Sequence, residues 1–353
     1  MPEVSAMKSG MDLATLVLRW QRTHGRHDLP WQGTQDPYRV WLSEIMLQQT
    51  QVATVRDYYA RFLRRFPDVA ALALAHQDEV LALWSGLGYY SRARNLHACA
   101  QQVVRDHGGA FPRSAHELQT LPGIGRSTAA AIASICFGER VAILDGNVKR
   151  VLTRLLGFGA DLADSASERA LWERATELLP TRDLARAMPI YTQGVMDLGA
   201  TVCTSRSPHC MACPLIGCCV AHQQGAHERY PVKTRRLKRS SESLWLLWSQ
   251  TPDGAVWLSQ RPTPGVWAGL YCLPLFDSRE ALETALPARQ RAALHDLPVV
   301  KHVLTHKDLH LHPVRLQLKS SSRLQTEGQW FEPAQWPQLG LPAPVRKLLT
   351  QAD

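Results

Sequence analysis

The feature that most restricts the fold of this chain is a group of four cysteines within seventeen residues. Cys203, Cys210, Cys213 and Cys219 follow the spacing C-x6-C-x2-C-x5-C. Four thiolates on so short a loop can converge on one metal centre, and sulfur ligands favour an iron-sulfur cluster or zinc over hard cations. Zinc sites more often combine two Cys-x-x-Cys pairs with a longer spacer, so the pattern favours a cubane cluster over a structural zinc. The adjacent Cys218 leaves the identity of the fourth ligand open.

Length and charge narrow the class of protein. A chain of 353 residues suggests about two domains, each able to bury its own core. Its net charge of +9 and its pI near 9.3 attract polyanions, although charge alone does not identify nucleic acid as the partner. The most apolar stretches are far too short to cross a bilayer, so we expect no membrane association and a cytoplasmic location.

The first part of the chain carries the pattern of a helical domain. Apolar residues recur at helical spacing from about residue 12 to residue 179, with Gly or Pro between the runs. Helices are predicted over residues 38–49, 55–66, 78–85, 92–107, 114–120, 127–137, 147–156, 167–179 and 188–198. We therefore expect an all-α domain over residues 1–222 that includes the cysteine loop, 203–219.

The pattern changes after the last cysteine of the loop. Residues 233–239 contain five Lys or Arg, which indicates a solvated linker or a contact with phosphate. Beyond Ser243, short β-like runs at 244–248, 256–260, 299–304 and 309–318 accompany helical stretches at 279–285 and 345–349. These patterns predict a basic linker over residues 223–240 and a small α+β domain over residues 241–353.

A glycine-rich turn lies between two of the predicted helices, at residues 121–125. Gly123 and Gly125 permit a tight turn whose backbone N–H groups point outward, and the helix that follows adds its positive end. Together they would form a seat for phosphate that does not depend on base sequence. The segment resembles a helix-hairpin-helix DNA-binding motif, and a plain glycine turn between helices is the alternative.

Two carboxyl groups stand in contexts that suggest acid-base chemistry. Asp145 ends an apolar stretch and precedes a helix, so on its own it predicts an N-cap. Glu44 is surrounded by apolar side chains, and burial would raise its pKa and keep it protonated near neutrality. One protonated acid and one carboxylate in a single cleft suit cleavage of a glycosidic bond, in which the acid assists the leaving group and the carboxylate stabilises an oxocarbenium-like sugar.

Five blocks of the sequence together resemble the adenine DNA glycosylases of the MutY type. These blocks are residues 41–52, 83–96, 121–131, 144–152 and the four-cysteine loop, and the likeness runs over most of residues 12–222. The family belongs to the helix-hairpin-helix glycosylases of the endonuclease III superfamily, which flip a base out of duplex DNA and cut its N-glycosidic bond. The resemblance implies base excision repair by a monomer with one 4Fe-4S cluster. The implied substrate is double-stranded DNA with adenine mispaired with 8-oxoguanine or guanine.

The same resemblance implies roles for individual residues. Glu44 would protonate the flipped adenine, at N7, and Asp145 would stay anionic and stabilise the sugar cation. Asn147 would help to order the site. Residues of the implied DNA interface are Gln48, Gln49, Thr50 and Tyr89, which match the segment that wedges into the duplex, and Gly123, Gly125 and Arg126 of the hairpin. For Tyr89, ordinary packing at a helix end is the alternative.

Ser127 separates this sequence from a sister family. The endonuclease III enzymes have at this position a lysine that forms a Schiff base with the sugar, and serine cannot do so. The resemblance therefore implies a monofunctional glycosylase that leaves an abasic site. A bifunctional glycosylase and lyase acting on pyrimidine lesions is the alternative enzyme. A non-catalytic DNA-binding or redox-sensing protein is the alternative of another class.

The second domain resembles the C-terminal, oxidised-guanine-recognising domain of the same family, which is related to Nudix hydrolases. Residues 265–274 carry this likeness, and Trp267 within them is equally suited to a core. The clustered glutamates of the Nudix catalytic box are missing, so nucleotide hydrolysis is not expected. Where the family often has Phe-Ser-His, this chain has Leu304, Thr305 and His306. The hydroxyl of Thr305 and the imidazole of His306 are therefore the candidates for lesion recognition.

Overall fold

The computed structural model describes residues 12–234, 238–321 and 324–351, and these residues fall into two units. The first unit contains residues 12–60 and 99–234. The second contains residues 61–98 together with the described residues from 238 onward. Residues 61–98 thus follow the first helices in sequence but group in space with the carboxy-terminal region. Residues 235–237, in the middle of the predicted basic linker, lie outside the described residues.

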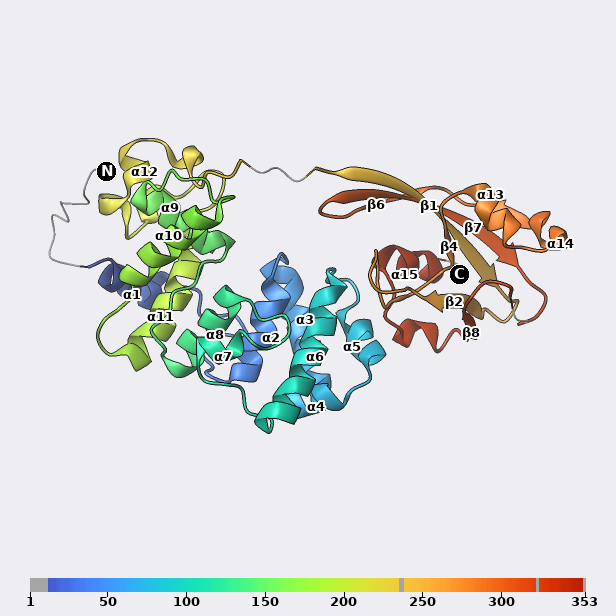
Figure 1. The fold of residues 1–353 in the computed structure, drawn as a ribbon, viewed down its shortest axis with the longest axis horizontal. Coiled ribbons are helices and arrows are strands. Elements are labelled where there is room, and N and C mark those ends of the chain that lie inside the picture. The colour runs from blue at the N-terminus through green and yellow to red at the C-terminus, as the bar shows by residue number, and fades with distance from the viewer. Residues whose placement is uncertain (1–11, 235–237, 322–323, 352–353) are drawn as a thin grey trace. The chain divides into compact units, whose positions relative to one another are not determined.

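The first unit consists of helices joined by short turns (Figure 1). Its helices include α1 (Leu13–His24), α2 (Pro37–Leu47), α7 (Ala115–Leu118), α8 (Arg126–Phe137), α9 (Gly146–Leu156), α10 (Ser165–Glu177), α11 (Leu184–Asp197) and α12 (Val220–Gln223). Helices α3 (Val52–Arg65) and α6 (Tyr90–His107) each belong in part to both units. A π-helical turn, Leu198–Val202, continues α11 toward the cysteine loop, which contains two 3-10 turns, Cys210–Ala212 and Ile216–Cys218.

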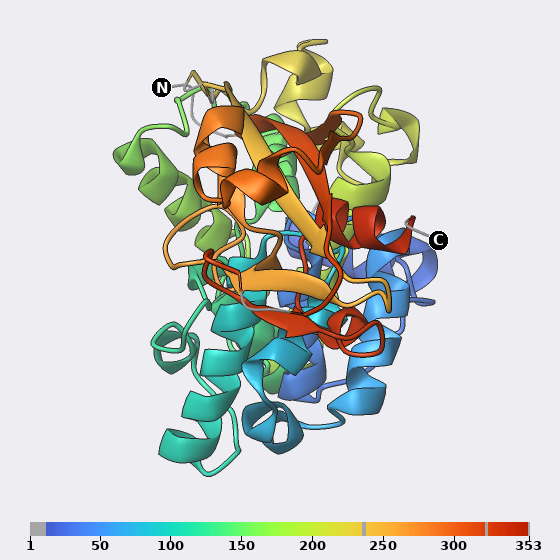
Figure 2. The ribbon, with the colours of Figure 1, turned by 90° about the vertical axis from the view of Figure 1, so that its right-hand side faces the viewer.

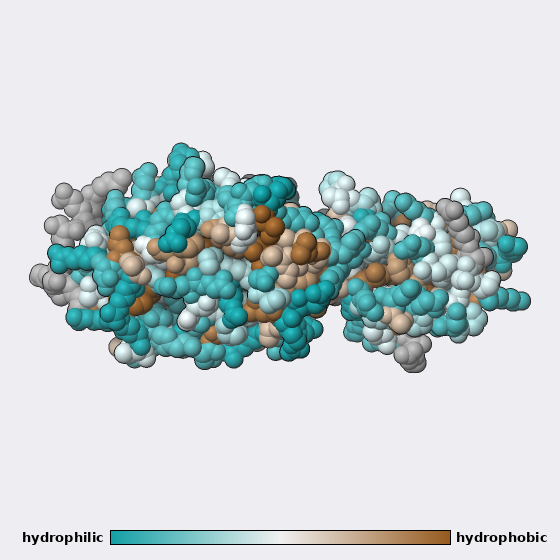
Figure 3. Space-filling model, turned by 90° about the horizontal axis from the view of Figure 1, so that it is seen from below, coloured by the Kyte–Doolittle hydropathy of each residue, from teal (hydrophilic) through white to brown (hydrophobic). Residues whose placement is uncertain are grey.

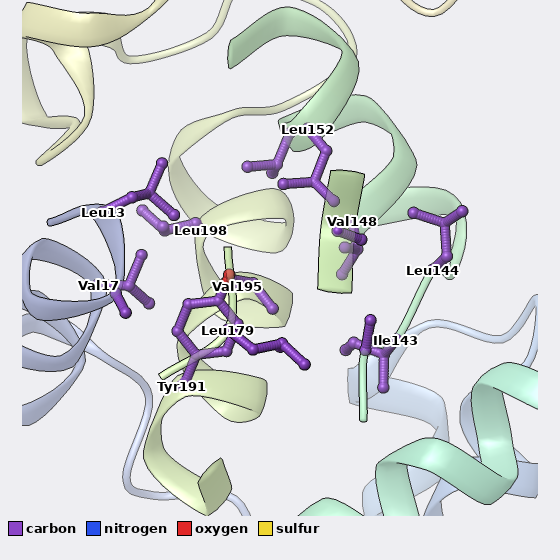
Figure 4. Close-up of a cluster of buried hydrophobic side chains, with 14 of the residues drawn as sticks. Leu13, Val17, Ile143, Leu144, Val148, Leu152, Leu179, Tyr191, Val195 and Leu198 are labelled. Carbon is purple, nitrogen blue, oxygen red and sulfur yellow. The ribbon is translucent and has the colours of Figure 1, made fainter. Parts of the chain in front are cut away.

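Helix α11 lies at the centre of the first unit and packs against α1, α8 and α9. Figure 4 shows Tyr191 and Val195 of α11 beside Val17 of α1, in a cluster that also contains side chains of α9. The approach of α1 to α11 requires a glycine, because a Cβ at Gly194 would lie 2.8 Å from Val17 Cγ1. Close packing of this kind leaves α11 little freedom to shift relative to α1.

The second unit begins with helices and ends with a mixed sheet. Its helical part contains α4 (Val69–Leu74) and α5 (Gln77–Trp84) with parts of α3 and α6. The sheet contains β1 (Ser240–Gln250), β2 (Val256–Gln260), β3 (Tyr271–Cys272), β4 (Leu275–Phe276), β5 (Leu294–Asp296), β6 (Val300–Val303), β7 (Lys307–Gln317) and β8 (Gln329–Phe331). Three short helices accompany it: α13 (Arg279–Thr284), α14 (Ala288–Arg291) and α15 (Ala343–Thr350).

The two long strands at the middle of the sheet run parallel, and the remaining described pairs are antiparallel. β1 pairs with β7 along its whole length, from Ser240 opposite Lys307 to Gln250 opposite Gln317. The strand order is β3-β2-β1-β7-β5, with β4 beside β1, β6 beside β7 and β8 beside β2. In Figure 2 the short helices lie against this twisted sheet. The prediction of a small α+β domain is confirmed.

Most predicted elements agree with the structure to within a few residues at their ends. Strand β2 has the predicted bounds, and the predicted helix at 147–156 is α9. The prediction did not delimit α1, α4 or α14, and it missed the short strands β3, β4, β5 and β8. The face shown in Figure 3 is mainly hydrophilic with small hydrophobic areas, as expected where most large apolar side chains lie in the cores. None of the helices in the described ranges combines the length and the apolar character that crossing a bilayer requires.

Candidate active site

Glu44 lies on α2, a helix whose remaining side chains are mostly buried. Asp36 caps the start of this helix by accepting a hydrogen bond from the Tyr38 backbone N–H at 2.9 Å. Trp41 and Leu42 are fully buried, and the Glu44 side chain is partly buried at the wall of a cavity of about 470 Å³. A cavity of this size can accommodate one nucleobase.

Asp145 is the N-cap of α9, as its position in the sequence predicted. Its Oδ1 accepts a hydrogen bond from the Val148 backbone N–H at 2.7 Å, and the residue itself is partly buried. The residue before it is also held in place, because the Leu144 backbone N–H donates to Ser127 Oγ at 3.0 Å. Ser127 therefore connects the start of α8 to the segment that carries the carboxylate.

The two carboxyl groups interact electrostatically. Burial, followed by repulsion from the Asp145 charge, raises the pKa of Glu44 to about 7. Burial also raises the pKa of Asp145, but backbone hydrogen bonds from Val148 and Asn147 oppose this rise, as do the charges of Arg150 and Lys149. Asp145 thus has charge-stabilising partners, whereas about half of Glu44 remains protonated at neutral pH. The expectation that burial raises the pKa of Glu44 is confirmed.

The cavity beside Glu44 has a polar lining that the sequence analysis did not identify. Its lining residues include Arg26, Trp31, Gln32, Gln193 and Glu44, whereas Asp145 is not among the described residues that line it. Both amide atoms of Gln32 are buried without a hydrogen-bond partner in the described part of the chain. An amide that offers an unmatched donor and an unmatched acceptor suits a ligand with polar edges.

Asn147 is linked to the beginning of the cysteine loop through Arg150. The Arg150 guanidinium donates to Asn147 Oδ1 at 2.9 Å and to the backbone oxygens of Gly199 and Cys203 at 2.6 and 2.7 Å. A Cβ at Gly199 would lie 2.6 Å from the Asn147 Cβ, so this close approach also requires glycine. The expected active-site asparagine, in the first turn of α9, is therefore packed against the π-helical turn that precedes the loop.

The four cysteines with the expected spacing line one small cavity. Cys203, Cys210, Cys213 and Cys219 all contribute to its wall. Cys218 is not among the described residues that line it, and its Sγ donates to the Leu215 oxygen at 3.4 Å. Within the described ranges, no three His, Cys, Asp or Glu side chains are arranged to hold a single metal ion. The donor set, four thiols around one cavity, fits an iron-sulfur cluster.

Arg154 of α9 supports the cysteine loop from inside the protein. Only 3% of this residue is exposed, and its guanidinium donates to the Thr204 and Ser205 oxygens at 2.6 and 3.1 Å. It also lies 3.5 Å from Cys203 Sγ. The loop is therefore held by a buried cation, which explains how a segment with little regular structure keeps one path.

The hairpin candidates have the backbone geometry that the motif requires. Gly123 has a φ of +75°, which favours glycine, and Gly125 is the N-cap of α8. No described side chain caps this helix start, and a Cβ at Gly125 would meet nothing within 4 Å. The amide groups at the start of α8 are thus approachable by a ligand. The Arg126 guanidinium lies over the Trp172 ring, 4.0 Å from its centroid.

The segment predicted to wedge into DNA follows α2. Gln49 is exposed and has a φ of +57°, a conformation that side chains other than glycine seldom adopt. Gln48 Nε2 donates to Thr128 Oγ1 at 3.4 Å, and Thr50 Oγ1 donates to the Gln48 oxygen at 3.3 Å. The strained, exposed Gln49 is consistent with a functional turn.

The remaining candidates meet in the second unit. Tyr89 is 42% exposed, has a φ of +49°, and forms a hydrogen bond with the Thr305 hydroxyl. Tyr89, Thr305, His306 and Trp267 line a cavity of about 490 Å³. Trp267 is 8% exposed, and its ring lies 6.0 Å from that of His302. Trp267 therefore serves the core and also forms part of the cavity wall.

Comparison with known proteins identifies the family of the chain. Residues 42–177 match the HhH-GPD superfamily of base excision DNA repair proteins, and residues 245–351 match the NUDIX domain. An adenine DNA glycosylase of Buchnera aphidicola (subsp. Acyrthosiphon pisum, strain APS) is 36% identical over 339 residues, which cover 95% of each chain. The chain belongs to the adenine DNA glycosylase family. The resemblance to this family and the Nudix-like character of the second domain are thus confirmed.

Other relatives agree with this assignment. The adenine DNA glycosylase of Homo sapiens is 45% identical over 222 residues, which cover 60% of this chain and 40% of the human protein. The structure of a thermostable thymine-DNA glycosylase superposes with a TM-score of 0.52 and 29% identity, over 60% of this chain and 95% of the other. An endonuclease III in a non-covalent DNA complex shares the fold, with a TM-score of 0.50 and 23% identity over 60% of this chain and 94% of the other. As a member of its family, the protein is an enzyme that hydrolyses N-glycosidic bonds.

Proposed function

We propose that this protein is a monofunctional DNA glycosylase that excises adenine mispaired with 8-oxoguanine or guanine in double-stranded DNA. The observation that carries the proposal is the electrostatic pairing of Glu44 with Asp145, with the pKa of Glu44 at about 7, beside a cavity of nucleobase size. Relatives named adenine DNA glycosylase that match nearly the whole chain support adenine as the base. Since these relatives are bacterial, we propose that the protein acts on chromosomal DNA in a bacterial cytoplasm. We propose that it acts as a monomer.

In the proposed reaction the protonated carboxyl of Glu44 donates its proton to N7 of the flipped adenine. The bond between C1′ and N9 then breaks, its electron pair leaves with the base, and positive charge develops on the sugar. The Asp145 carboxylate stabilises this cation, and its bonds to the backbone at Val148 and Asn147 keep it in place during the reaction. Water adds to C1′ and loses a proton, which leaves an abasic site.

Strand cleavage is not part of the proposed reaction. A lyase needs an amine that forms a Schiff base with the sugar, and the side chain at the relevant position is the Ser127 hydroxyl. This hydroxyl already accepts the Leu144 N–H, which suits a positioning role beside Asp145. Borohydride trapping of a protein-DNA adduct, together with strand scission in the absence of alkali, would favour the bifunctional alternative.

Further residues are proposed to hold the DNA. The uncapped start of α8 at Gly125 would bind a backbone phosphate through its amide groups, with Gly123 shaping the turn and Arg126 nearby. The segment of Gln48, Gln49 and Thr50, and separately Tyr89, would fill the gap that the flipped base leaves, which offsets an unstacking cost of about a few kcal/mol. Thr305 and His306 would contact the oxidised guanine.

The cysteine loop is proposed to hold one 4Fe-4S cluster through Cys203, Cys210, Cys213 and Cys219. All four line the same cavity, and thiolate is the ligand that such clusters prefer. When bound, the cluster would stabilise the fold of the loop. Arg154 and Arg150 would keep this loop attached to α9, the helix that begins beside Asp145.

A strand-cleavage assay tests the proposed function. A labelled duplex with adenine opposite 8-oxoguanine is incubated with the protein and then heated in alkali, which breaks the strand at an abasic site. We expect cleavage at the adenine with 8-oxoguanine or guanine opposite, and less cleavage with cytosine or thymine. Intact adenine strands in all four duplexes would refute the proposal.

A further inference from the structure

A half-buried arginine supports the turn that carries Tyr89. This turn, residues 85–89, joins α5 to α6, and Gly86, Gly88 and Tyr89 within it have φ of +103°, +71° and +49°. Such a conformation is costly for tyrosine, because its Cβ crowds the following carbonyl oxygen. The turn therefore keeps this path only if neighbouring groups hold it.

Arg92, in the first turn of α6, supplies two of the contacts that hold it. Its Nη2 donates to the Leu87 and Gly88 oxygens at 3.3 and 3.4 Å. The Gly88 oxygen also accepts a hydrogen bond from the Trp84 indole N–H at 3.1 Å. Since Trp84 is fully buried and Tyr89 is exposed, the turn is held from its buried side.

The same guanidinium faces two aromatic rings. Its Cζ lies 5.4 Å from the centroid of the buried Trp84 ring and 5.3 Å from the centroid of the exposed Tyr89 ring. A guanidinium at such a distance is attracted to the face of an aromatic ring. Burial lowers the pKa of Arg92 to about 10, so the side chain keeps its charge at neutral pH. One cation thus connects the core to the exposed ring.

We propose that Arg92 is a positioning residue, which holds the turn and the Tyr89 ring in the conformation that enters the base stack. A ring that must first be ordered loses part of its stacking free energy to that ordering, and a ring already in place does not. This inference rests on the proposed function, because it takes Tyr89 as a residue that fills the gap left by the flipped base.

Insertion of the ring can be measured by fluorescence, without a chemical step. A 2-aminopurine is placed beside the base opposite the target adenine, and a 2′-fluoro sugar at that adenosine prevents loss of the adenine. At saturating full-length protein, insertion unstacks the probe and raises its emission. We expect Arg92→Met to reduce this rise severalfold, and an unchanged rise in folded Arg92→Met would overturn the proposal. No rise with the unaltered protein would refute the wedge role of Tyr89, and this inference with it.

Two further variants keep the test decisive if Arg92→Met does not fold, which circular dichroism would show. Arg92→Gln removes the charge but keeps an N–H donor, and it should also reduce the rise in emission. Arg92→Lys keeps the charge without the planar face, so it should give an intermediate rise. A rise with Arg92→Lys equal to that of the unaltered protein or of Arg92→Gln would contradict the role of the guanidinium.

Arg65→Met is the matched control for removing a cation from an aromatic ring. The Arg65 guanidinium lies 5.1 Å from the centroid of the Phe66 ring and forms an ion pair with Glu79 at the surface. These contacts lie at the end of α3 and the start of α5, so Arg65→Met should leave the rise in emission unaltered. A reduction as large as that in Arg92→Met would show general loosening of these helices and would overturn the assignment.

A double-variant comparison shows whether Arg92 acts through Tyr89. Single-turnover excision of adenine opposite 8-oxoguanine is measured for Tyr89→Ala, for Arg92→Met and for both together. We expect Arg92→Met to slow excision about tenfold, and to add nothing once the ring is absent. A further loss in the double variant would contradict the proposal. If the unaltered protein releases no adenine, the proposed function fails; if it does, and emission does not depend on Arg92, only this assignment fails.

Discussion

The cavity beside Glu44 in the first unit and the cavity beside Tyr89 in the second unit differ in how their side chains are held. In the first unit, Gln193 of the cavity wall donates a hydrogen bond to the buried Asp197. Asp145, which is not among the described residues of that wall, is held by the Val148 backbone N–H at the start of α9. In the second unit, Tyr89 and Thr305 are exposed and form a hydrogen bond with each other. Catalysis depends on groups that are already in position, because reorganisation during the reaction adds to the barrier. The first cavity has the organisation expected for chemistry, and the second has the organisation expected for inspecting a surface.

The largest expected effect comes from removing the fixed charge in the first unit. Asp145→Asn keeps an N-cap for α9, since asparagine caps helices about as well as aspartate. It removes the carboxylate that stabilises the sugar cation, so we expect single-turnover excision to slow on the order of 10³-fold. DNA affinity, measured by fluorescence anisotropy, should change little. Near-normal turnover would show that the first cavity does not owe its chemistry to Asp145.

The pH dependence of excision tests the second carboxyl of the same pair. Because the pKa of Glu44 is about 7, the protonated acid disappears as pH rises above 7, and the rate should fall about tenfold per pH unit. Glu44→Gln should be slow at every pH and should lack this decline. A rate profile of the unaltered protein that stays flat from pH 6 to pH 9 would contradict the role of Glu44 as the acid.

Glu44 should also affect folding stability with a sign that follows from its raised pKa. The folded protein holds this proton up to a pH of about 7, whereas the unfolded chain releases it near the ordinary value of 4.5. Stability from this group is therefore complete below pH 4.5 and is lost as pH rises through 7. At pH 8, Glu44→Gln should be more stable than the unaltered protein, by up to about 3 kcal/mol. Urea unfolding of both proteins at pH 5 and pH 8 measures this difference in the free energy of unfolding. If the difference between Glu44→Gln and the unaltered protein were the same at both pH values, the prediction would be refuted.

The cysteine loop offers a matched pair of variants in the first unit. Cys219 lines the cavity with the other three cysteines, whereas Cys218 bonds to a backbone oxygen outside it. Cys219→Ser should therefore lose iron and the absorption at about 400 nm, and Cys218→Ser should retain both. Iron content measured per protein chain decides between them. If Cys218→Ser lost its iron and Cys219→Ser retained it, the fourth ligand would be Cys218, and the proposed assignment to Cys219 would be wrong.

The parts of this molecule that could be predicted are those whose signal lies within a short segment. Helix α9 has an N-cap at Asp145, a strong apolar face and a left-handed glycine at its end, Gly157, so the prediction of 147–156 differs from its bounds by one residue. Strands β3 and β4 contain only two residues each, which is too short for any alternation to be visible. Pairing across the sheet defines these strands, and pairing is a property of the whole fold.

The side chains of the cavity wall were missed for a related reason. Gln32 and Gln193 look like ordinary polar residues in the sequence, and only the folded structure shows that they border one cavity. Arg26 and Asp197 are separated by 171 positions in the chain, so no local pattern could connect them. Glu44 was recognised because apolar neighbours within three positions already indicated its burial. Buried polar networks between distant segments therefore remain the part of the site that requires coordinates.

The smallest expected effect concerns the second cavity, where Tyr89 and Thr305 form a hydrogen bond with each other. Tyr89→Phe removes the hydrogen bond to Thr305 but keeps the ring, and such a bond contributes about 1 kcal/mol. We expect the preference for 8-oxoguanine over guanine opposite adenine to change severalfold, while excision in the best duplex stays nearly normal. Tyr90→Phe is the matched control, because its hydroxyl donates to the Leu341 oxygen at 3.0 Å. If Tyr89→Phe slowed excision equally opposite every base, Tyr89 would act on the chemistry, and the contrast between a catalytic and an inspecting cavity would not hold.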